Sequence, residues 1–346
     1  MEEKDQLFMQ RAIQLALLGR ATVSPNPMVG CVITVDDRII GEGWHQKAGE
    51  AHAEVRAIAS VQDASLLTKA TAYVTLEPCA HFGKTPPCAN LLVEKMVKRV
   101  VIGCADPNPL VAGKGIEILR SAGIEVTLDC LKESCLSINK VFFHSIKERI
   151  PYVILKWAET ADGFIAKENY DSKWISNINA RQIVHKWRSE SDAILVGKNT
   201  AKYDNPSLNV RLWAGKSPLR VVIDHTCSLS AELNIFKQDL PTLIYNTERN
   251  LEQRHIQWIK LASVDFYQQL LKDLYKRNIA SLFIEGGKNT LEAFIEKGFW
   301  NEARIFRSQV LFESGISAPK LKNERLVSNE KVVANDLSTY INKKTN

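Results

Sequence analysis

The chain has 346 residues, of which 45% are apolar and 24% charged, and a formal net charge of +6. These values are typical of globular proteins, which excludes disordered and fibrous classes, and the length predicts about two domains. The charge is too small and too evenly spread for a nucleic-acid binder. No apolar run approaches the roughly 18 residues of a membrane span. We therefore expect no nucleic-acid or membrane partner.

The cysteines and the start of the chain bear on the compartment. The first residues, MEEKDQ, are acidic where a signal peptide would be basic, so we expect a cytoplasmic location. Seven cysteines are an odd number, which argues against a disulfide framework. Reduced thiols, some of them holding a metal, are the expected state.

The first half alternates predicted helices and short strands. Apolar residues at Met9, Ala12, Ile13, Ala16 and Leu17 predict one buried helical stripe over 4–19. Strand-like runs follow at 29–35, 71–76, 99–104 and 125–128, with helix-like stretches at 51–61 and 88–96 between them. This order predicts an α/β layer with a mixed sheet.

The pattern restarts after residue 148. Buried strands are predicted at 151–159, 193–198, 220–224, 242–246 and 281–287, and helices near 179–190, 265–277 and 288–297. We therefore expect two α/β domains, 1–147 and 148–346.

One motif in the first half carries chemistry. Cys79 and Cys88 bracket the loop EPCAHFGKTPPC, and His52 and Glu54 lie two residues apart at a predicted helix start. Residues two apart on a helix point about 200° away from each other, so one can bind a metal while the other reaches a bound water. We expect His52, Cys79 and Cys88 to bind Zn²⁺, which prefers nitrogen and sulfur, and Glu54 to be catalytic.

Two non-catalytic interpretations of this motif stay open. The cysteines could be buried thiols beside an unrelated histidine, or the site could be a structural zinc with His81 as a fourth ligand. The pattern H-x-E followed by P-C matches the zinc nucleobase deaminases, although eight residues separate the cysteines where the usual signature has two.

Four motifs in order point to one family. They are SPNPMVGCVI (24–33), GEGWHQKAGEAHAE (41–54), TLEPCAHFGKTPPC (75–88) and ADPNPLVAGKGIEIL (105–119). Together they resemble the deaminase half of the bifunctional riboflavin-biosynthesis deaminase–reductases. The resemblance implies a cytidine-deaminase-like three-layer domain that removes ammonia hydrolytically from 2,5-diamino-6-(ribosylamino)pyrimidinone 5′-phosphate. It further implies substrate binding by Asn26 and His45, with His81 and Lys84 as additional candidates.

The second half resembles the reductase half of the same family. The matching landmarks are LKWAETADG (155–163), DSKWIS (171–176), AILVGKNTAKYDNPSLNVR (193–211), RVVID (220–224) and FIEGGKNTL (283–291). They imply a dihydrofolate-reductase-like α/β domain that uses NADPH to reduce the ribosyl side chain of 5-amino-6-(5-phosphoribosylamino)uracil to ribityl. A strand running into two glycines and a helix also suits a phosphate at the helix start.

The resemblance assigns roles in this half residue by residue. Lys156 and Glu285 assist hydride transfer; Ser172, Arg188, Leu208, Arg211 and Glu285 bind substrate; Glu159, Trp174, Thr200, Asp204, Gly287, Lys288, Asn289, Thr290, Leu291, Glu292 and Ala293 line the cofactor. The two arginines suit a phosphate because a guanidinium fork matches its oxygens.

Departures from the family pattern keep alternatives open. Glu159 brings a charge to a position where a small residue is common, and Lys288 stands where proline is frequent. The alternatives are a deaminase with a degenerate second domain, a nucleoside or tRNA deaminase, and a zinc-stabilised binding module. The resemblance also implies a homo-oligomer.

Overall fold

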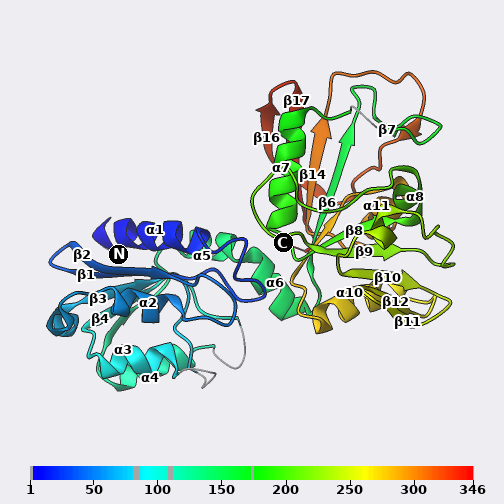
Figure 1. Ribbon diagram of the computed structural model, residues 1–346. Helices are drawn as coiled ribbons and strands as arrows, with labels where there is room; N and C mark the ends of the chain where they lie inside the picture. The colour runs from blue at the N-terminus through cyan, green and yellow to red at the C-terminus, as the bar shows by residue number, and fades with distance from the viewer. Residues whose placement is uncertain (1–2, 81–85, 108–111, 173–174, 346) are drawn as a thin grey trace. The chain divides into compact units, whose positions relative to one another are not determined.

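The computed structural model describes residues 3–80, 86–107, 112–172 and 175–345. The chain divides into two compact units, Met1–Arg149 and Ile150–Asn346, each with its own sheet and helices (Figure 1). Within the described ranges, every helix is too short or too polar to cross a lipid bilayer.

The first unit is built on a five-stranded mixed sheet. Its order is β2 (Arg38–Trp44), β1 (Gly30–Val35), β3 (Thr71–Val74), β4 (Arg99–Ile102) and β5 (Glu125–Thr127). β1 pairs antiparallel with β2 and β3, whereas β3, β4 and β5 run parallel. The parallel strands require crossovers, which the helices of the unit supply.

Helices cover both faces of this sheet. Cys31 and Ile33 belong to a core cluster with residues of α2 (Ala53–Ala59), α3 (Cys88–Glu94) and α4 (Lys114–Ser121). Val32, between them, belongs to a cluster with α1 (Glu3–Leu17) and α5 (Lys132–Ile138), because successive side chains of a strand point to opposite faces. A 3₁₀ turn, Ala64–Lys69, and α6 (Lys140–Glu148) complete the unit. The predicted three-layer fold is confirmed.

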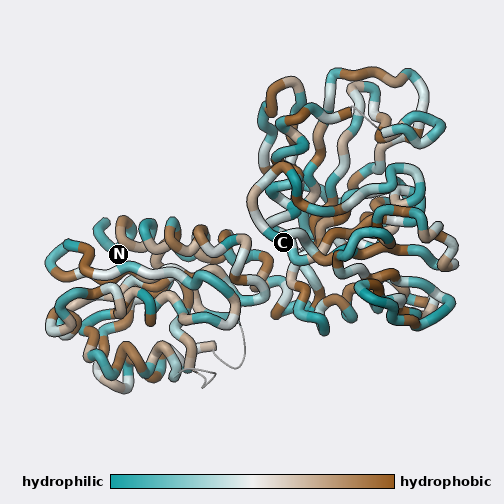
Figure 2. The backbone as a smooth tube through the Cα atoms, in the orientation of Figure 1, coloured by the Kyte–Doolittle hydropathy of each residue, from teal (hydrophilic) through white to brown (hydrophobic). Residues whose placement is uncertain are grey.

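Helix α1 illustrates how the sequence pattern sets the layers. Phe8, Met9, Ala12, Ile13 and Ala16 are buried, at the helical spacing read from the sequence. Leu15 is also buried and the predicted Leu17 is half-buried, while polar residues occupy most of the other positions, so the tube of α1 alternates between hydrophobic and hydrophilic segments (Figure 2). The helix therefore buries one stripe against the sheet.

Two glycines in β2 bring α2 unusually close to the sheet. A β-carbon on Gly41 would lie 2.5 Å from the carbonyl oxygen of Ala57, and one on Gly43 would lie 2.4 Å from its backbone nitrogen. Only hydrogen fits at these positions, so the backbone of α2 packs directly on β2. This contact fixes the helix that begins immediately after His52.

The second unit contains a ten-stranded sheet. Its order is β11 (Leu251–Gln253), β12 (Ile256–Lys260), β10 (Thr242–Asn246), β9 (Leu219–Ile223), β8 (Ala193–Gly197), β13 (Ser281–Ile284), β6 (Tyr152–Glu159), β14 (Glu302–Arg307), β17 (Asn335–Asn342) and β16 (Glu324–Val332). The pairs from β12 to β14 are parallel, and the outer pairs are antiparallel. A small sheet pairs β7 (Phe164–Ala166) with β15 (Ile316–Ser317).

The central strands of this sheet are buried on both faces. All residues of β8 and β13 are buried, as is usual for parallel strands covered by helices. The helices are α7 (Ile178–Ser189), α8 (Lys198–Tyr203), α9 (Asn234–Lys237), α10 (Phe266–Lys276) and α11 (Lys288–Glu296). Helices α8 and α11 start directly after β8 and shortly after β13, so their first residues lie at the carboxyl edge of the sheet. Ligands of open α/β sheets bind at this edge.

Candidate functional site

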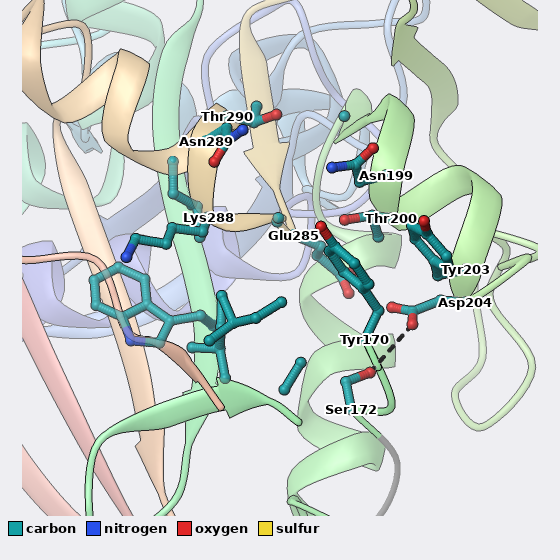
Figure 3. Close-up of a pocket in the computed structure, with 18 of the residues that line it drawn as sticks. Tyr170, Ser172, Asn199, Thr200, Tyr203, Asp204, Glu285, Lys288, Asn289 and Thr290 are labelled. Atoms are coloured by element: carbon teal, nitrogen blue, oxygen red, sulfur yellow. Dashed lines mark hydrogen bonds between the residues drawn. The ribbon is translucent and has the colours of Figure 1, made fainter. Parts of the chain in front are cut away.

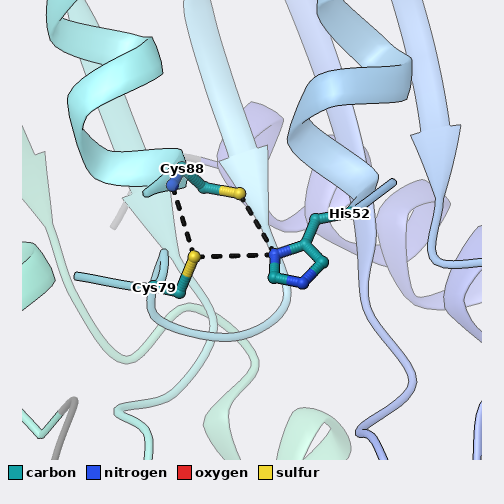
Figure 4. A group of neighbouring side chains, drawn as sticks. All are labelled: His52, Cys79 and Cys88. Carbon is teal, nitrogen blue, oxygen red and sulfur yellow. Dashed lines mark hydrogen bonds between the residues drawn. The ribbon is translucent and has the colours of Figure 1, made fainter. Parts of the chain in front are cut away.

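Three predicted metal ligands converge in the first unit. His52 is the N-cap of α2, Cys79 follows β3, and Cys88 is the first residue of α3. The Nδ1 atom of His52 lies 3.3 Å from Sγ of Cys88 and 3.5 Å from Sγ of Cys79 (Figure 4). The three ligand atoms lie within 4.8 Å of one another, the one such His/Cys/Asp/Glu group in the described part of the chain.

The two thiols compete for one negative charge. A hydrogen bond from the Cys88 side chain, aided by His52, lowers the pKa of Cys79 to about 4 although burial opposes this shift. The same bond raises the pKa of Cys88, together with burial and the charge of Glu54. The backbone N–H of Cys88 also donates to Cys79 Sγ at 3.3 Å. A second thiolate would need a cation, and this nitrogen–sulfur donor set fits Zn²⁺.

Glu54 is buried against this group. Glu54 lies in the first turn of α2 and is only 3% exposed. Burial and the charge of Cys79 raise the pKa of Glu54, and its carboxyl group interacts with the Cys88 side chain. A carboxyl group in this position can exchange a proton with a molecule bound at the three ligands.

His45 lies next to the predicted ligand His52 and contacts Asn26. The Asn26 amide Nδ2 is 3.1 Å from Nε2 of His45, and Nδ1 of His45 is 3.2 Å from the carbonyl oxygen of Ala51. Because a carbonyl can only accept, we assign the proton of His45 to Nδ1, so Nε2 accepts from Asn26. The His45 ring meets that of His52 edge-on, with centroids 5.5 Å apart. The two predicted substrate-binding residues are thus brought together beside the metal ligands.

A buried asparagine that the sequence did not single out holds the Asn26 loop. The side chain of Asn139 accepts from the N–H of Met28 at 2.8 Å and donates to the carbonyl of Met28 at 2.9 Å. Asn139 lies over one hundred positions from Met28, so no local pattern could have indicated the contact. The other two candidates of this unit, His81 and Lys84, lie outside the described residues.

The second unit contains a cavity of about 680 Å³ at the carboxyl edge of its sheet. Ten of the predicted residues line it: Lys156, Ser172, Thr200, Asp204, Glu285, Gly287, Lys288, Asn289, Thr290 and Leu291 (Figure 3). Tyr170, Lys198, Asn199, Tyr203 and His225 also line it and were not predicted. The apolar and polar lining and the volume suit a cofactor with a small substrate.

Six of the predicted residues that the structure describes do not line the cavity. Arg188, Leu208, Arg211, Glu159, Glu292 and Ala293 lie outside its lining, and Trp174 lies outside the described residues. The carboxylate of Glu159 accepts from the Trp157 indole at 2.9 Å and from Arg307 at 2.6 and 2.8 Å. The negative charge of Glu159 is therefore paired with Arg307.

Two charged side chains that line the cavity, Lys156 and Glu285, interact with each other and with Arg188, which lies outside the lining. Arg188 donates from Nε and Nη2 to the two carboxylate oxygens of Glu285, and both side chains are largely buried. Burial raises the pKa of Glu285, but the charges of Arg188 and Lys156 outweigh it and the pKa is lowered. Burial lowers the pKa of Lys156. The charges of Arg188 and Lys156 thus keep Glu285 in its carboxylate form.

The segment before residue 173 is attached to α8 by two contacts. The rings of Tyr170 and Tyr203 are parallel, with centroids 4.1 Å apart, and Ser172 donates to Asp204 at 3.2 Å (Figure 3). Both contacts lie among residues lining the cavity. They hold Ser172, a predicted substrate ligand, against the helix that carries Thr200.

Known proteins match both units. Residues 2–104 match the cytidine and deoxycytidylate deaminase zinc-binding region, and residues 151–312 match the RibD C-terminal domain. The riboflavin biosynthesis protein RibD of Aquifex aeolicus is 37% identical over 322 residues, which cover 91% of this chain and 90% of that protein. RibD of Actinobacillus pleuropneumoniae is 41% identical over 312 residues, 86% and 82% of the two chains.

Solved structures match the whole chain as well. A diaminohydroxyphosphoribosylaminopyrimidine deaminase/5-amino-6-(5-phosphoribosylamino)uracil reductase from Thermotoga maritima superposes with a TM-score of 0.91 at 36% identity, covering 98% of this chain and 99% of that one. Acinetobacter baumannii RibD superposes with a TM-score of 0.89 at 35% identity and the same coverage. These relatives are matched over most of their own length as well as over most of this chain. The chain therefore belongs to the RibD family, the bifunctional enzymes of riboflavin biosynthesis that join a zinc-dependent deaminase to an NADPH-dependent reductase.

Proposed function

We propose that residues 1–147 deaminate 2,5-diamino-6-(ribosylamino)pyrimidinone 5′-phosphate, and that residues 148–346 then reduce the ribosyl side chain of 5-amino-6-(5-phosphoribosylamino)uracil to ribityl. The similar Thermotoga maritima protein is described as a deaminase and reductase of these two compounds, which supports this choice of substrates. The observation that carries the proposal is the meeting of His52, Cys79 and Cys88 around one point, with Glu54 buried alongside.

In the deaminase half, His52, Cys79 and Cys88 would hold the zinc. The bound ion would acidify a water molecule at neutral pH. Glu54 takes up a proton from the attacking water and passes it to the pyrimidine ring. It then passes the second proton, from the added hydroxyl group, to the leaving amine, since one carboxyl group can serve as base and acid in turn. Asn26 and His45 orient the substrate, an assignment supported by the hydrogen bond that fixes them beside His52.

In the reductase half, the residues lining the cavity divide between cofactor and substrate. NADPH would supply the hydride to the first carbon of the ring-opened sugar. Thr200, Asp204 and the run 287–291 line the cofactor, with the start of α11 facing its phosphates. Lys156 donates a proton towards the sugar oxygen, and Glu285 holds that ammonium group by its opposite charge.

The arginines are proposed to bind the substrate phosphate. Arg188 and Arg211 are both tied to residue 209: Arg188 donates to the Asn209 carbonyl at 3.1 Å and Arg211 to its side-chain oxygen at 3.1 Å. This shared partner keeps two guanidinium groups near one another, which suits an anion of two charges. Ser172, Leu208, Trp174, Glu159, Glu292 and Ala293 stay predictions from the resemblance, as do a cytoplasmic location and a homo-oligomer.

Product analysis tests the proposal. The purified chain is given the diaminopyrimidine substrate with and without NADPH, and products are identified by mass spectrometry. We expect ammonia and the deaminated ribosyl compound without NADPH, and the ribityl compound with it. Deamination without any reduction would leave only the first half of the proposal standing; turnover of cytidine in place of the substrate would overturn the choice of substrate.

A further inference from the structure

Glu77 is a buried carboxylate two residues before Cys79, and it is not one of the three proposed metal ligands. It lies between β3 and the cysteine loop and is 3% exposed. Its own N–H donates to the carbonyl of Cys104 at 2.9 Å. A buried charge of this kind costs free energy unless it is well hydrogen-bonded, so its partners are informative.

Four backbone N–H groups converge on the two oxygens of this carboxylate. Oε2 accepts from Asp106 at 3.2 Å and Gly113 at 3.0 Å; Oε1 accepts from Gly115 at 3.0 Å and Ile116 at 3.4 Å. The last three donors belong to the start of α4, whose N-cap residue, Gly113, has no side chain to cap it. Glu77 therefore caps α4 from a distant part of the chain, where a negative charge is also favoured by the helix dipole.

The cysteine loop is consequently held from both sides. On one side, Glu77 ties it to α4, and the carbonyl oxygen of Pro78 lies so near Gly115 that a β-carbon there would be 2.0 Å away. On the other side, Cys79 accepts from the first turn of α3, with Ala89 N–H on its carbonyl at 3.2 Å and Cys88 N–H on its sulfur at 3.3 Å. The position of Cys79 Sγ follows from these two anchors.

We propose that Glu77 is a positioning residue for the metal site: its carboxylate, fixed by the start of α4, places Cys79 Sγ where it meets His52 and Cys88. This inference rests on the proposed metal role of those three residues. All four backbone donors to Glu77 belong to the motif ADPNPLVAGKGIEIL (105–119). The inference therefore assigns this motif a structural role at the metal site.

The first experiment compares Glu77→Gln with Asp5→Asn. In Glu77→Gln, one oxygen becomes an NH₂ group that cannot accept, so one pair of N–H donors loses its partner. Asp5 is a matched control: it is 1% exposed in the same unit, is hydrogen-bonded to Arg99 and Tyr73, and belongs to α1, on the other face of the sheet. Zinc affinity of each full-length variant is measured by competition with a chromogenic chelator.

We expect Glu77→Gln to weaken zinc binding about 10- to 100-fold, the usual effect of losing a residue that orients a metal ligand. Asp5→Asn should leave the affinity at the wild-type value. At saturating zinc, Glu77→Gln should regain most of its kcat, because the Glu77 carboxylate is hydrogen-bonded to backbone N–H groups and has no proposed role in substrate binding or proton transfer. Wild-type zinc affinity in Glu77→Gln, or an equal loss in Asp5→Asn, would overturn the inference.

A second pair of variants serves if Glu77→Gln does not fold. Gly113 and Gly123 flank α4 with φ values of 78° and 81°, and a β-carbon on either would meet nothing within 4 Å. An alanine therefore introduces the same left-handed strain at both positions, but only Gly113 donates to Glu77. We expect Gly113→Ala to weaken zinc binding by up to about tenfold and Gly123→Ala to leave it unchanged; equal effects would count against the inference.

Cys88→Ser separates this inference from the proposed function. If Cys88→Ser retains wild-type zinc affinity, the metal site itself is misassigned. If Cys88→Ser loses zinc while Glu77→Gln and Gly113→Ala keep it, the metal site stands and the positioning role of Glu77 is wrong.

Discussion

The guanidinium group of Arg188 donates two parallel hydrogen bonds to Glu285, from Nε at 2.6 Å and from Nη2 at 2.9 Å. The side chains are 12% and 9% exposed, so this is a nearly buried ion pair in fork geometry. Such a pair adds little net stability compared with an apolar pair, but removing one partner leaves a buried charge alone. The pair therefore constrains both the stability of the second unit and the orientation of Glu285.

Arg188→Met should destabilise the second unit by about 3–5 kcal/mol, because Glu285 keeps its charge without its main partner. Denaturant unfolding followed by tryptophan fluorescence measures this, since Trp44 alone of the seven tryptophans lies in the first unit. The double variant Arg188→Met/Glu285→Gln should recover most of the stability and none of the NADPH oxidation. A single variant as stable as wild type would show that the pair is open to solvent.

Glu54→Gln should lower the rate of deamination by at least about 10²-fold, because the amide cannot carry the proton. Zinc content should stay at the wild-type value, since Glu54 is not one of the three ligands. Ammonia release and elemental analysis of the same sample measure the two quantities. An unchanged rate would favour the binding-module alternative, and simultaneous loss of zinc would make Glu54 part of the metal site. NADPH-dependent reduction is the internal control.

His185 should make the second unit less stable below neutral pH. Burial, with the charges of Arg188 and Arg211, lowers the pKa of His185 to about 4. Its ordinary value is about 6.5. Between these two pH values the unfolded chain binds the proton more readily than the folded chain. The contribution of neutral His185 to the free energy of unfolding is therefore fully present above about pH 6.5. It is lost as the pH falls towards 4, by about 3 kcal/mol at most. Protonation would also remove the acceptor of the Arg211 N–H.

The control for this pH effect is His185→Gln, whose side-chain oxygen can still accept from Arg211. Unfolding free energies of both proteins are compared at pH 7.5 and pH 5. We expect a steeper decline in the wild type, with the difference assigned to His185 because other titrating groups are shared. Identical declines would mean that His185 is charged in the folded state at pH 5.

Tyr170→Ala should loosen the segment that carries Ser172, because the stacking on Tyr203 is lost. An aromatic pair contributes about 0.5–1.5 kcal/mol, which corresponds to a rise in the reductase KM of roughly 2- to 13-fold. We expect kcat to change less than KM, since Lys156 and Glu285 are untouched. Tyr170→Phe keeps the ring and should retain the wild-type KM. Steady-state NADPH oxidation measures both; a drop in kcat alone would contradict this role.

Periodicity in the sequence predicts most of the core elements. The stripe of α1 and the apolar runs of β8 and β13 are visible because burial on one or both faces imposes a fixed spacing. Strand β2 was not predicted. Its glycines at 41 and 43 lower the strand propensity, yet they are required by the close approach of α2. The hairpin of β16 and β17 was also missed, since most of β16 is exposed and has no apolar alternation.

Some residues of the candidate sites could be predicted from the sequence and others could not. His52, Cys79 and Cys88 were found because metal ligands are few residue types at restricted spacings. The roles of Glu77 and Asn139 depend on backbone groups far along the chain, and backbone groups leave no trace in the sequence. Glu159 shows the same limit: its partner Arg307 is 148 positions away, so its charge looked unpaired.

The glycines of β2 also restrict how this enzyme can evolve. Any larger side chain at Gly43 would push on the backbone of Ala53 and Ala57, and hence on the whole first turn of α2. Since His52 caps that turn and Glu54 belongs to it, such a displacement would move a proposed zinc ligand and the proton carrier together. Adaptation to a different nucleobase must therefore come from the surrounding loops, with this turn inherited unaltered.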